Sequence, residues 1–318
     1  MHKTLRPRIS LVLMAVAGVL LWAALPVLVS RHVVDLLVFA GIYSIAGLGV
    51  SYLLGNCGIV TLAQSVFYGI GAYCVAYFSA QHGLPSGVGF GMGALLSAAI
   101  AFTVGWPTLR LSGHFLALAT LALGLIGQTL FLEWDWITGG TLGIGGLPKL
   151  SLLGWNLNTP QRFYYLVWPI AVLVMWLKHN LTHSRNGLAM RAMRDAPDAA
   201  AVAGVEIHAL KVKMFMLSAI LGSLAGSLFA HYVGFVSVDS FGVDRSISFL
   251  LLAVLGGVHT SWGPALGAIF VTLVPEALSR FGEIHSVLFA VTLVIAVIFL
   301  PHGLGGAFER LLRRKADA

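Results

Sequence analysis

The charged side chains that could do chemistry or contact a partner gather in one polar segment, residues 178–213 of the 318-residue chain. Within it, Arg191 stands four residues before Asp195, and Arg194 stands four residues before Asp198. On a helix this spacing predicts two ion pairs, each worth about a few tenths of a kcal/mol. The rest of the chain is strongly apolar, so we expect this segment to be the surface that meets a water-soluble partner.

The same segment carries the start and stop signals of two short helices. The first is predicted over residues 188–195, and Pro197 interrupts it because a proline disfavours helical geometry in the residue before it. The second is predicted over residues 199–205 and ends near Gly204. A small apolar face of the first helix would consist of Ala189, Met193 and Ala196. Together the helices would form a compact docking element, and the alternative is a solvated loop with incidental helicity.

A second group of polar residues lies at membrane depth, in and around the apolar stretch at 59–80. Glycines on both sides of these residues predict an interrupted helix. Broken helices expose backbone groups and helix ends that can hold the charged groups of a solute midway across a membrane. The residues expected to line such a pathway are Thr61, Gln64 and Ser65, followed by Tyr43 and Thr120. The alternative is that these side chains pack and satisfy hydrogen bonds.

Several kinds of chemistry lack their residues in this sequence. No Gly-x-x-x-x-Gly-Lys-Ser/Thr motif occurs, so the chain has no phosphate-binding loop of its own. His179, His183 and His208 share the polar segment without a metal-ligand geometry, and no nucleophile–base set is visible. Cys57 and Cys74 both lie in apolar sequence, which favours buried, unpaired thiols. We therefore expect no enzyme activity, no metal and no cofactor bound by this chain.

The elements that must position the polar residues are membrane helices. Apolar residues make up 58% of the chain and charged residues 10%, with a mean hydropathy of +0.91, whereas soluble domains are about a quarter charged. The net charge of +7 does not indicate nucleic acid, because the basic residues sit beside apolar spans. The sequence predicts an all-α, polytopic bundle in the lipid bilayer, with some broken or short helices, as one transmembrane domain over residues 1–318.

Apolar runs near 20 residues are long enough to cross hydrocarbon as helices, and the best division is ten spans, with eight or nine possible. They are predicted at residues 9–29, 33–54, 59–80, 87–106, 115–131, 163–177, 214–236, 247–256, 265–278 and 287–300. The first span follows Lys3, Arg6 and Arg8, as a signal peptide would. Its long apolar run without a convincing cleavage site favours an uncleaved helix.

Basic residues set the orientation of the ten spans. With the N-terminus in the cytoplasm, the cytoplasmic side holds Lys3, Arg6, Arg8, Arg110, Lys178, Arg185, Arg191, Arg194, Lys211, Lys213, Arg310, Arg313, Arg314 and Lys315. The outer side holds Arg31, Lys149, Arg162, Arg245 and Arg280. This bias follows the positive-inside rule, and it predicts that both termini and residues 178–213 are cytoplasmic.

Small residues recur at a spacing of four in one predicted helix. They are Ser218, Gly222, Gly226 and Ala230. Such a row lets helix backbones approach closely, so tight packing is the expectation. The alternative is a seam along which helices slide.

Two carboxylates lie near span ends, Asp35 beside Arg31 and Glu276 before Arg280. Ionisable residues in membrane helices are functional candidates, because they are costly to keep there. Positions at the membrane surface are the expectation for both. A secondary transporter coupled to an ion gradient would instead use one of these carboxylates, and this alternative stays open.

A series of short motifs runs along nearly the whole chain. They are Gly58, Ala63-Gln-Ser-Val-Phe-Tyr-Gly-Ile-Gly-Ala-Tyr73, Leu109-Arg-Leu-Ser-Gly-His-Phe115, Thr138-Gly-Gly140, Gly187-Leu-Ala-Met-Arg-Ala-Met-Arg-Asp195 with Ala200 and Gly204, Lys211, Phe215, Leu255-Gly-Gly257, Trp262-Gly-Pro264 and Pro301-His-Gly-Leu304. In order and spacing the chain resembles the permeases of branched-chain amino acid importers of the ATP-binding-cassette class, in particular their larger permease subunit.

This resemblance implies a permease that works with a second, related permease, two cytoplasmic ATP-binding subunits and an extracytoplasmic binding protein, in the bacterial inner membrane. The partner subunits would use the ATP. The residues implied in coupling to them are Arg191, Arg194, Asp195, Asp198, Ala200 and Gly204. Asp198 stands where the family's loop has Glu, and Gln64 stands where relatives often have Leu.

The resemblance leaves the substrate open. A branched-chain or related amino acid is expected, and urea, amides or small carboxylates are alternatives. A self-contained secondary transporter would use an ion gradient through Glu276 or Asp35, and a passive channel would need no docking element.

Overall fold

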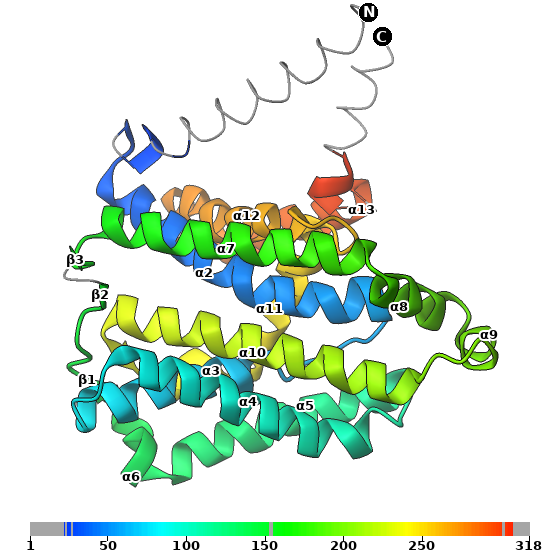
Figure 1. Ribbon diagram of the computed structural model, residues 1–318. Coiled ribbons are helices and arrows are strands. Elements are labelled where there is room, and N and C mark those ends of the chain that lie inside the picture. Colours follow the sequence, from blue (N-terminus) through cyan, green and yellow to red (C-terminus); the bar gives the residue numbers. More distant parts are fainter. Residues whose placement is uncertain (1–21, 23, 27, 153–154, 301–302, 308–318) are drawn as a thin grey trace, which may run out of the picture.

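The computed structural model describes residues 22, 24–26, 28–152, 155–300 and 303–307. The first predicted span, at residues 9–29, falls largely outside this part of the chain, as do the basic residues from Arg310 to Lys315. Each predicted span from residue 33 onward overlaps a helix, and strands are confined to short pairs. The predicted all-α bundle is therefore confirmed in its class (Figure 1).

The bundle contains long and short helices that run side by side. The long ones are α2 (Arg31–Ser51), α4 (Ser86–Thr108), α5 (His114–Glu133), α7 (Pro160–His183) and α10 (Ile207–Val233). The shorter ones are α3 (Gln64–Val75), α11 (Val243–Gly256), α12 (Gly263–Leu278) and α13 (His285–Phe299). Helices α2 and α3 each continue as π-helical turns, over Tyr52–Asn56 and Ala76–Gln81. Brief 3₁₀ turns occupy Gly140–Leu142, Val238–Phe241 and Ser279–Ile284.

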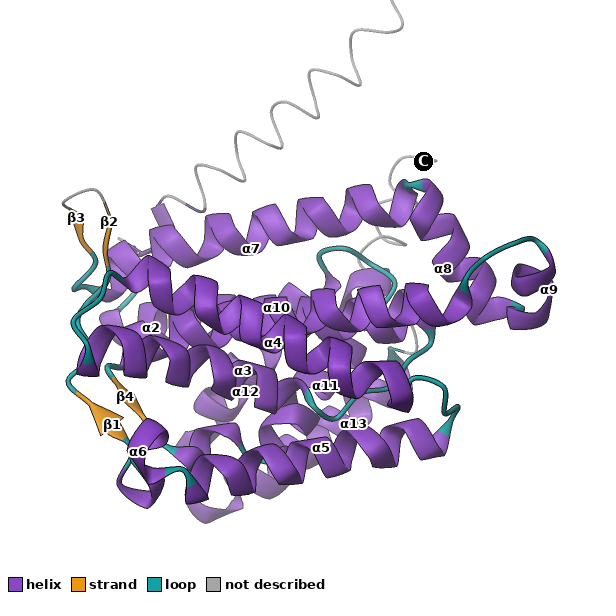
Figure 2. Ribbon diagram, turned by 60° about the horizontal axis from the view of Figure 1, so that its bottom comes forward, coloured by secondary structure: helices purple, strands orange, loops and turns teal. Residues whose placement is uncertain are grey.

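The two ends of the bundle differ. At one end β1 (Ile144–Gly145) pairs antiparallel with β4 (Phe235–Val236), and β2 (Ser151–Leu152) pairs with β3 (Trp155–Asn156), beside the short helix α6 (Asp135–Thr138). At the other end α8 (Arg185–Asp195) and α9 (Pro197–Val202) extend beyond the long helices. Both views show this separation (Figures 1 and 2). We call these the strand end and the α8–α9 end.

Burial distinguishes central helices from peripheral ones. Four helices in the described part of the chain are long and apolar enough to cross a membrane, namely α2 with its π-helical continuation, α4, α5 and α10. In α2 and α10, 72% of the most apolar stretch is buried, against 22% in α4 and 28% in α5. Apolar side chains such as Leu95 and Leu118 remain exposed on the outer helices. An apolar outer surface is what lipid surroundings require.

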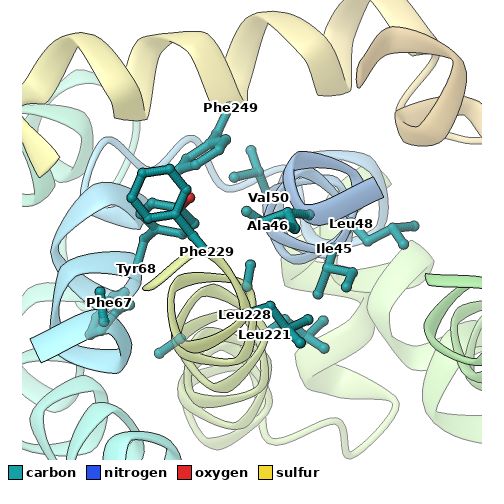
Figure 3. Packing of buried hydrophobic residues seen from close by; sticks show 14 of the residues in the cluster. Ile45, Ala46, Leu48, Val50, Phe67, Tyr68, Leu221, Leu228, Phe229 and Phe249 are labelled. Atoms are coloured by element: carbon teal, nitrogen blue, oxygen red, sulfur yellow. The ribbon is translucent and has the colours of Figure 1, made fainter. Parts of the chain in front are cut away.

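Helix α10 forms the centre of the core (Figure 3). Its Leu221 and Leu228 lie beside Ile45 of α2, and Tyr68 of α3 lies on the other side. The Tyr68 ring centroid is 5.4 Å from that of Phe229 on α10. The core therefore joins helices from the N-terminal and C-terminal halves of the chain.

The small-residue row of α10 is buried, and two of its glycines face α3. A Cβ on Gly226 would overlap the Tyr68 carbonyl, and a Cβ on Gly222 would come within 2.9 Å of the Gln64 amide nitrogen. The contact is reciprocal, because a Cβ on Gly71 of α3 would overlap the Ser223 carbonyl. Ala230 is fully buried further along α10. Backbone-to-backbone approach at this interface depends on the missing side chains.

Several predicted boundaries are wrong. The third span was expected from residue 59, but α3 begins at Gln64, because the chain is irregular over residues 58–63 and Gly58 has a left-handed φ of +68°. The stretch between the two flanking membrane helices is shorter than the predicted polar segment 178–213. Helix α7 continues to His183 and α10 already begins at Ile207, so α8 and α9 make up most of what lies between.

Candidate coupling site and transport cavity

The α8–α9 element is built by local signals. The Ser184 hydroxyl accepts a hydrogen bond of 3.3 Å from the Gly187 amide and caps the start of α8. Ala196 leaves helical geometry, α9 starts at Pro197, and Gly204 follows it with a φ of +85°. Both predicted short helices are present, and each begins earlier than predicted.

The two predicted i,i+4 ion pairs are wrong. Arg194 Nε donates to the neighbouring Asp195 Oδ1 at 2.8 Å, and Arg191 Nη1 donates to the Thr182 carbonyl at the end of α7 at 3.2 Å. Asp198 is exposed, because the turn at Ala196 takes it off the face of Arg194. The hydrogen bond from Arg194 lowers the pKa of the exposed Asp195 carboxyl. Arginines near helix ends here satisfy carbonyls that the helices leave unpaired.

Arg194 connects α8 to the bundle. Its Nη1 donates to the Gly55 carbonyl at 2.6 Å, in the π-helical continuation of α2. The same nitrogen lies 3.2 Å from Nδ1 of His259, in the loop between α11 and α12. The Gly58 position is close as well, since a Cβ there would come within 2.9 Å of Arg194 Cγ. One side chain of α8 thus touches two other segments that are far apart in sequence, the end of α2 and the loop between α11 and α12.

The underside of α8–α9 is apolar, and of the predicted face Ala189, Met193 and Ala196 it contains Met193 as a buried residue. Met190, Met193 and Ala200 are buried, whereas Ala196 is exposed at the turn. On the outer side Val202 is 91% exposed, and Leu188 is also exposed. The element is attached to the bundle through one face and offers apolar side chains on the other. Val202 was not singled out from the sequence, although an apolar residue at the end of a short helix was a usable signal.

Lys178 is a functional candidate that the sequence reasoning treated only as a positive charge. It is 1% exposed, and its Nζ donates to the Ser51 hydroxyl, to the Val258 carbonyl at 3.2 Å and to the Thr260 carbonyl at 3.0 Å. All three N–H donors of the ammonium group therefore have acceptors. These bonds join α7, the end of α2 and the loop between α11 and α12. The signal in the sequence was a lysine directly after the predicted apolar span 163–177.

Gln64, one of the three residues first expected on the pathway, is hydrogen-bonded to helix backbones. Its amide nitrogen donates to the Ala46 carbonyl at 3.2 Å and to the Ser218 carbonyl at 3.1 Å. The Ser218 hydroxyl donates back to Gln64 Oε1 at 3.1 Å. Gln64 thereby links the start of α3 to α2 and α10.

The other residues expected on the pathway divide into two groups. Thr61, Ser65 and Thr120 are buried around the start of α3. The Thr120 hydroxyl accepts from the Leu62 amide at 3.1 Å, and the Thr61 hydroxyl accepts from the Ala63 amide at 3.3 Å. Ser65 exchanges hydrogen bonds with the Ser246 hydroxyl. Tyr43, by contrast, lines a cavity.

This cavity, of about 410 Å³, lies between α2, α11 and α12 toward the strand end. Its lining residues are Leu36, Phe39, Tyr43, Arg245, Ser248, Phe249, Leu252, Val271, Thr272, Pro275, Glu276 and Ser279. Arg245 Nη1 donates to the Tyr43 hydroxyl at 3.3 Å. Arg245 was expected only as an outer charge, and its place here follows from the packing of α11 against α2.

The two carboxylates near span ends lie at the strand end, as surface positions would require. Glu276 Oε1 is 2.7 Å from His32 Nε2, and its side chain is 43% exposed. Asp35 accepts a hydrogen bond from the Tyr232 hydroxyl. In the part of the chain that the structure describes, no group of three His, Cys, Asp or Glu side chains could hold a metal ion.

Comparison with known proteins gives consistent matches. The sequence pattern of the family described as "Branched-chain amino acid transport system / permease component" matches residues 32–297. The high-affinity branched-chain amino acid transport system permease protein LivM of Escherichia coli K12 is 33% identical over 315 residues, covering 92% of this chain and 74% of that protein.

Two more distant relatives differ from each other in the substrate that their names give. The probable branched-chain amino acid transport permease protein LivM of Methanocaldococcus jannaschii is 25% identical over 93% of this chain and 90% of its own length. The autoinducer 2 import system permease protein LsrC of Escherichia coli O9:H4 is 27% identical over 63% of this chain and 66% of its own. No solved structure matches the chain significantly.

Proposed function

The chain belongs to the family of branched-chain amino acid transport permeases, and we propose that it is the membrane-spanning subunit of an importer driven by a separate ATP-binding subunit. The observation that carries the proposal is the attachment of α8 through Arg194 to the end of α2 and to the loop after α11. A partner that moves α8–α9 would act on both of these segments.

We place the α8–α9 end in the cytoplasm and the strand end outside, with ten spans across the bacterial inner membrane. Helix α2 leads from the strand end to the α8–α9 end, and the later helices alternate in direction. The described basic residues near the α8–α9 end are Arg110, Lys178, Arg185, Arg191, Arg194, Lys211 and Lys213. They outnumber the basic residues near the strand end. The positive-inside rule expects the more basic side of a membrane protein in the cytoplasm, which supports this orientation.

The coupling that we propose is mechanical. ATP-binding subunits dock on the exposed face of α8–α9, where Val202 and Leu188 lie, and shift this element when they close on ATP. Arg194 transmits the shift to Gly55 and His259, and Lys178 holds α7 to the same junction. The movement favours one of two helix arrangements, which is how a ligand or partner drives a conformational change.

The partners we propose are a second, related permease, two ATP-binding subunits and an extracytoplasmic binding protein. The substrate is a branched-chain or related amino acid, which the 33% identity to a permease of that description supports. The weaker match to an autoinducer 2 permease covers less of the chain. Urea, amides and small carboxylates are the alternative substrates to be tested beside the branched-chain amino acids.

Reconstitution tests this proposal directly. The chain, its partner permease and its ATP-binding subunits are placed in proteoliposomes, and uptake of labelled leucine, isoleucine, valine and urea is measured with the binding protein supplied. We expect amino acid uptake that requires ATP and the binding protein. Uptake by this chain alone, driven by a proton or sodium gradient without ATP, would overturn the proposal.

A further inference from the structure

The cavity between α2, α11 and α12 combines one basic and one acidic side chain with an apolar wall. We propose that it is an outer binding site for a zwitterionic amino acid, in which Arg245 receives the carboxylate and Glu276 receives the ammonium group. This inference rests on the proposed importer function and adds the residues of this chain that recognise the substrate.

Arg245 is held in place but keeps most of its donors. Its guanidinium carbon lies 5.2 Å from the centroid of the Tyr43 ring, a cation–π distance, and Nη1 donates to the Tyr43 hydroxyl. A guanidinium carries five N–H donors in a fixed fork, and within the described residues Tyr43 is its hydrogen-bond partner. The remaining donors suit the two oxygens of a carboxylate, which arginine binds in a bidentate manner.

Glu276 offers the opposite charge on the facing helix. One carboxylate oxygen contacts His32 at 2.7 Å, and the second has no hydrogen-bond partner among the residues that the structure describes. The neighbouring Thr272 hydroxyl, on the same helix and the same cavity wall, is buried and also has no partner in that part of the chain. A primary ammonium group has three donors and would satisfy such acceptors.

The two charges line one cavity without neutralising each other. Within the described residues no acidic side chain forms an ion pair with Arg245, and Glu276 makes its contact with His32. An α-amino acid carries a carboxylate and an ammonium on the same carbon. A bound zwitterion would therefore give Arg245 a carboxylate partner and Glu276 an ammonium partner. A simple acid or a simple amine would leave one of the two protein charges without its counterpart.

The rest of the wall is suited to an aliphatic side chain. Its apolar members are Leu36, Phe39, Phe249, Leu252 and Val271. A volume of about 410 Å³ falls in the range of small-molecule sites, which are mostly apolar with a few polar groups that fix orientation. The cavity therefore matches the chemistry of a branched, uncharged side chain attached to a zwitterionic head.

The position and exposure of the site fit a transient role. It lies near the strand end, which is the outer end in the proposed orientation, and Glu276 is 43% exposed. Solvent weakens an exposed charge interaction, so the site would hold the substrate loosely. A transport site must release what it binds, and loose binding suits that requirement.

Ligands that lack one charged group test the assignment. The complete transporter is assembled in lipid nanodiscs without the binding protein, and binding of labelled leucine is measured. Competitors are leucine, 4-methylpentanoate, which lacks the ammonium, and 3-methylbutylamine, which lacks the carboxylate. The variants are Arg245→Gln, Arg245→Lys and Glu276→Gln. Arg280→Gln is the control, because Arg280 is exposed at the same end and does not line the cavity.

We expect wild type and Arg280→Gln to prefer leucine over both analogues. Arg245→Gln should weaken leucine binding about tenfold and remove the preference over 3-methylbutylamine, and Arg245→Lys should restore part of it. Glu276→Gln should remove the preference over 4-methylpentanoate. Unchanged binding in both neutral variants overturns the inference, as does a wild-type complex that binds no leucine while it still imports leucine with ATP. Loss of all ATP-driven uptake in wild type would instead count against the proposed function.

Discussion

The guanidinium of Arg194 donates a 2.6 Å hydrogen bond to the carbonyl of Gly55, so the element α8–α9 and the end of α2 are directly bonded. The carbonyl belongs to a π-helical segment, in which the backbone hydrogen bonds run from i to i+5 and not from i to i+4 as in an α-helix. A Cβ on Gly55 would overlap the Val258 carbonyl, so the same point also touches the loop after α11. Three segments share one small junction.

Replacing Arg194 by Met should uncouple transport from ATP hydrolysis. The bonds to Gly55 and His259 disappear, whereas Met190 and Met193 still pack α8 against the bundle. We expect ATP-dependent leucine uptake to fall at least about tenfold, with assembly retained on size-exclusion chromatography. Arg185→Met is the matched control, because Arg185 lies exposed on the same helix and loses the same charge. Equal uptake in the two variants would rule out this coupling route.

A charge at Val202 should block docking of the ATP-binding subunit. Val202 is 91% exposed at the end of α9, so Val202→Asp changes little inside the permease but places a carboxylate on the proposed contact. We expect the ATP-binding subunit to be lost on co-purification. Leu142→Asp serves as control, since Leu142 is 85% exposed on a short turn at the strand end. If Val202→Asp retains its partner as well as Leu142→Asp does, the contact lies elsewhere.

Removing the charge of Lys178 should destabilise the bundle. In Lys178→Met the Ser51 hydroxyl and the carbonyls of Val258 and Thr260 lose a buried charged donor, at a cost of about 2 kcal/mol or more. The readout is the Tm in detergent. Lys213→Met, an exposed lysine at the start of α10, should leave the Tm within about 1 °C of wild type. A similar Tm for both variants would show that the Lys178 bonds add no stability.

Gly226→Ala should force α3 and α10 apart. The added Cβ would overlap the backbone carbonyl of Tyr68, which cannot move without its helix, so we expect a loss of about 3 kcal/mol in unfolding free energy. Gly91→Ala is the control on α4, where an added Cβ meets nothing within 4 Å and alanine favours the helix. Thermal melts of the two variants in the same detergent give the comparison. A stable Gly226→Ala protein would contradict the tight interface.

Gln64→Leu distinguishes packing from a pathway role. The substitution removes three hydrogen bonds among Gln64, Ala46 and Ser218, so a packing residue should lose about 1–2 kcal/mol of stability while KM for uptake stays unchanged. A residue that contacts the passing substrate would instead raise KM or change the preference among leucine, isoleucine and valine. Uptake kinetics and a thermal melt of the same preparation separate the two outcomes.

The helices were predictable because hydropathy is a local property. The helices α2, α3, α4, α5, α7, α10, α11, α12 and α13 each fall on an apolar run, and the elbow between α8 and α9 follows from Pro197 and Gly204. The start of α3 was misplaced by five residues, since Ile59 is as apolar as a helix residue and only the left-handed Gly58 before it reveals the irregular stretch.

The site was much less predictable, because its bonds join distant parts of the sequence. Gly55 lies 139 residues before Arg194, and Thr260 lies 82 residues after Lys178. Local spacing suggested instead that Arg194 would pair with Asp198, one helical turn away. That expectation failed because the chain leaves the helix at Ala196, and backbone carbonyls at helix ends are better placed acceptors. Such acceptors belong to every residue and leave no signature in sequence.

Lys178 has one more consequence for the junction between α2, α7 and the loop after α11. A hydroxyl and two carbonyls that converge on a cation form the kind of oxygen cage that could otherwise hold sodium or potassium. Here the cation is the Lys178 ammonium, which is attached to the chain, so its presence at these oxygens does not depend on the ions in the medium. The protein therefore supplies from its own side chain the donor group that these three oxygens share, at the place where its helices meet.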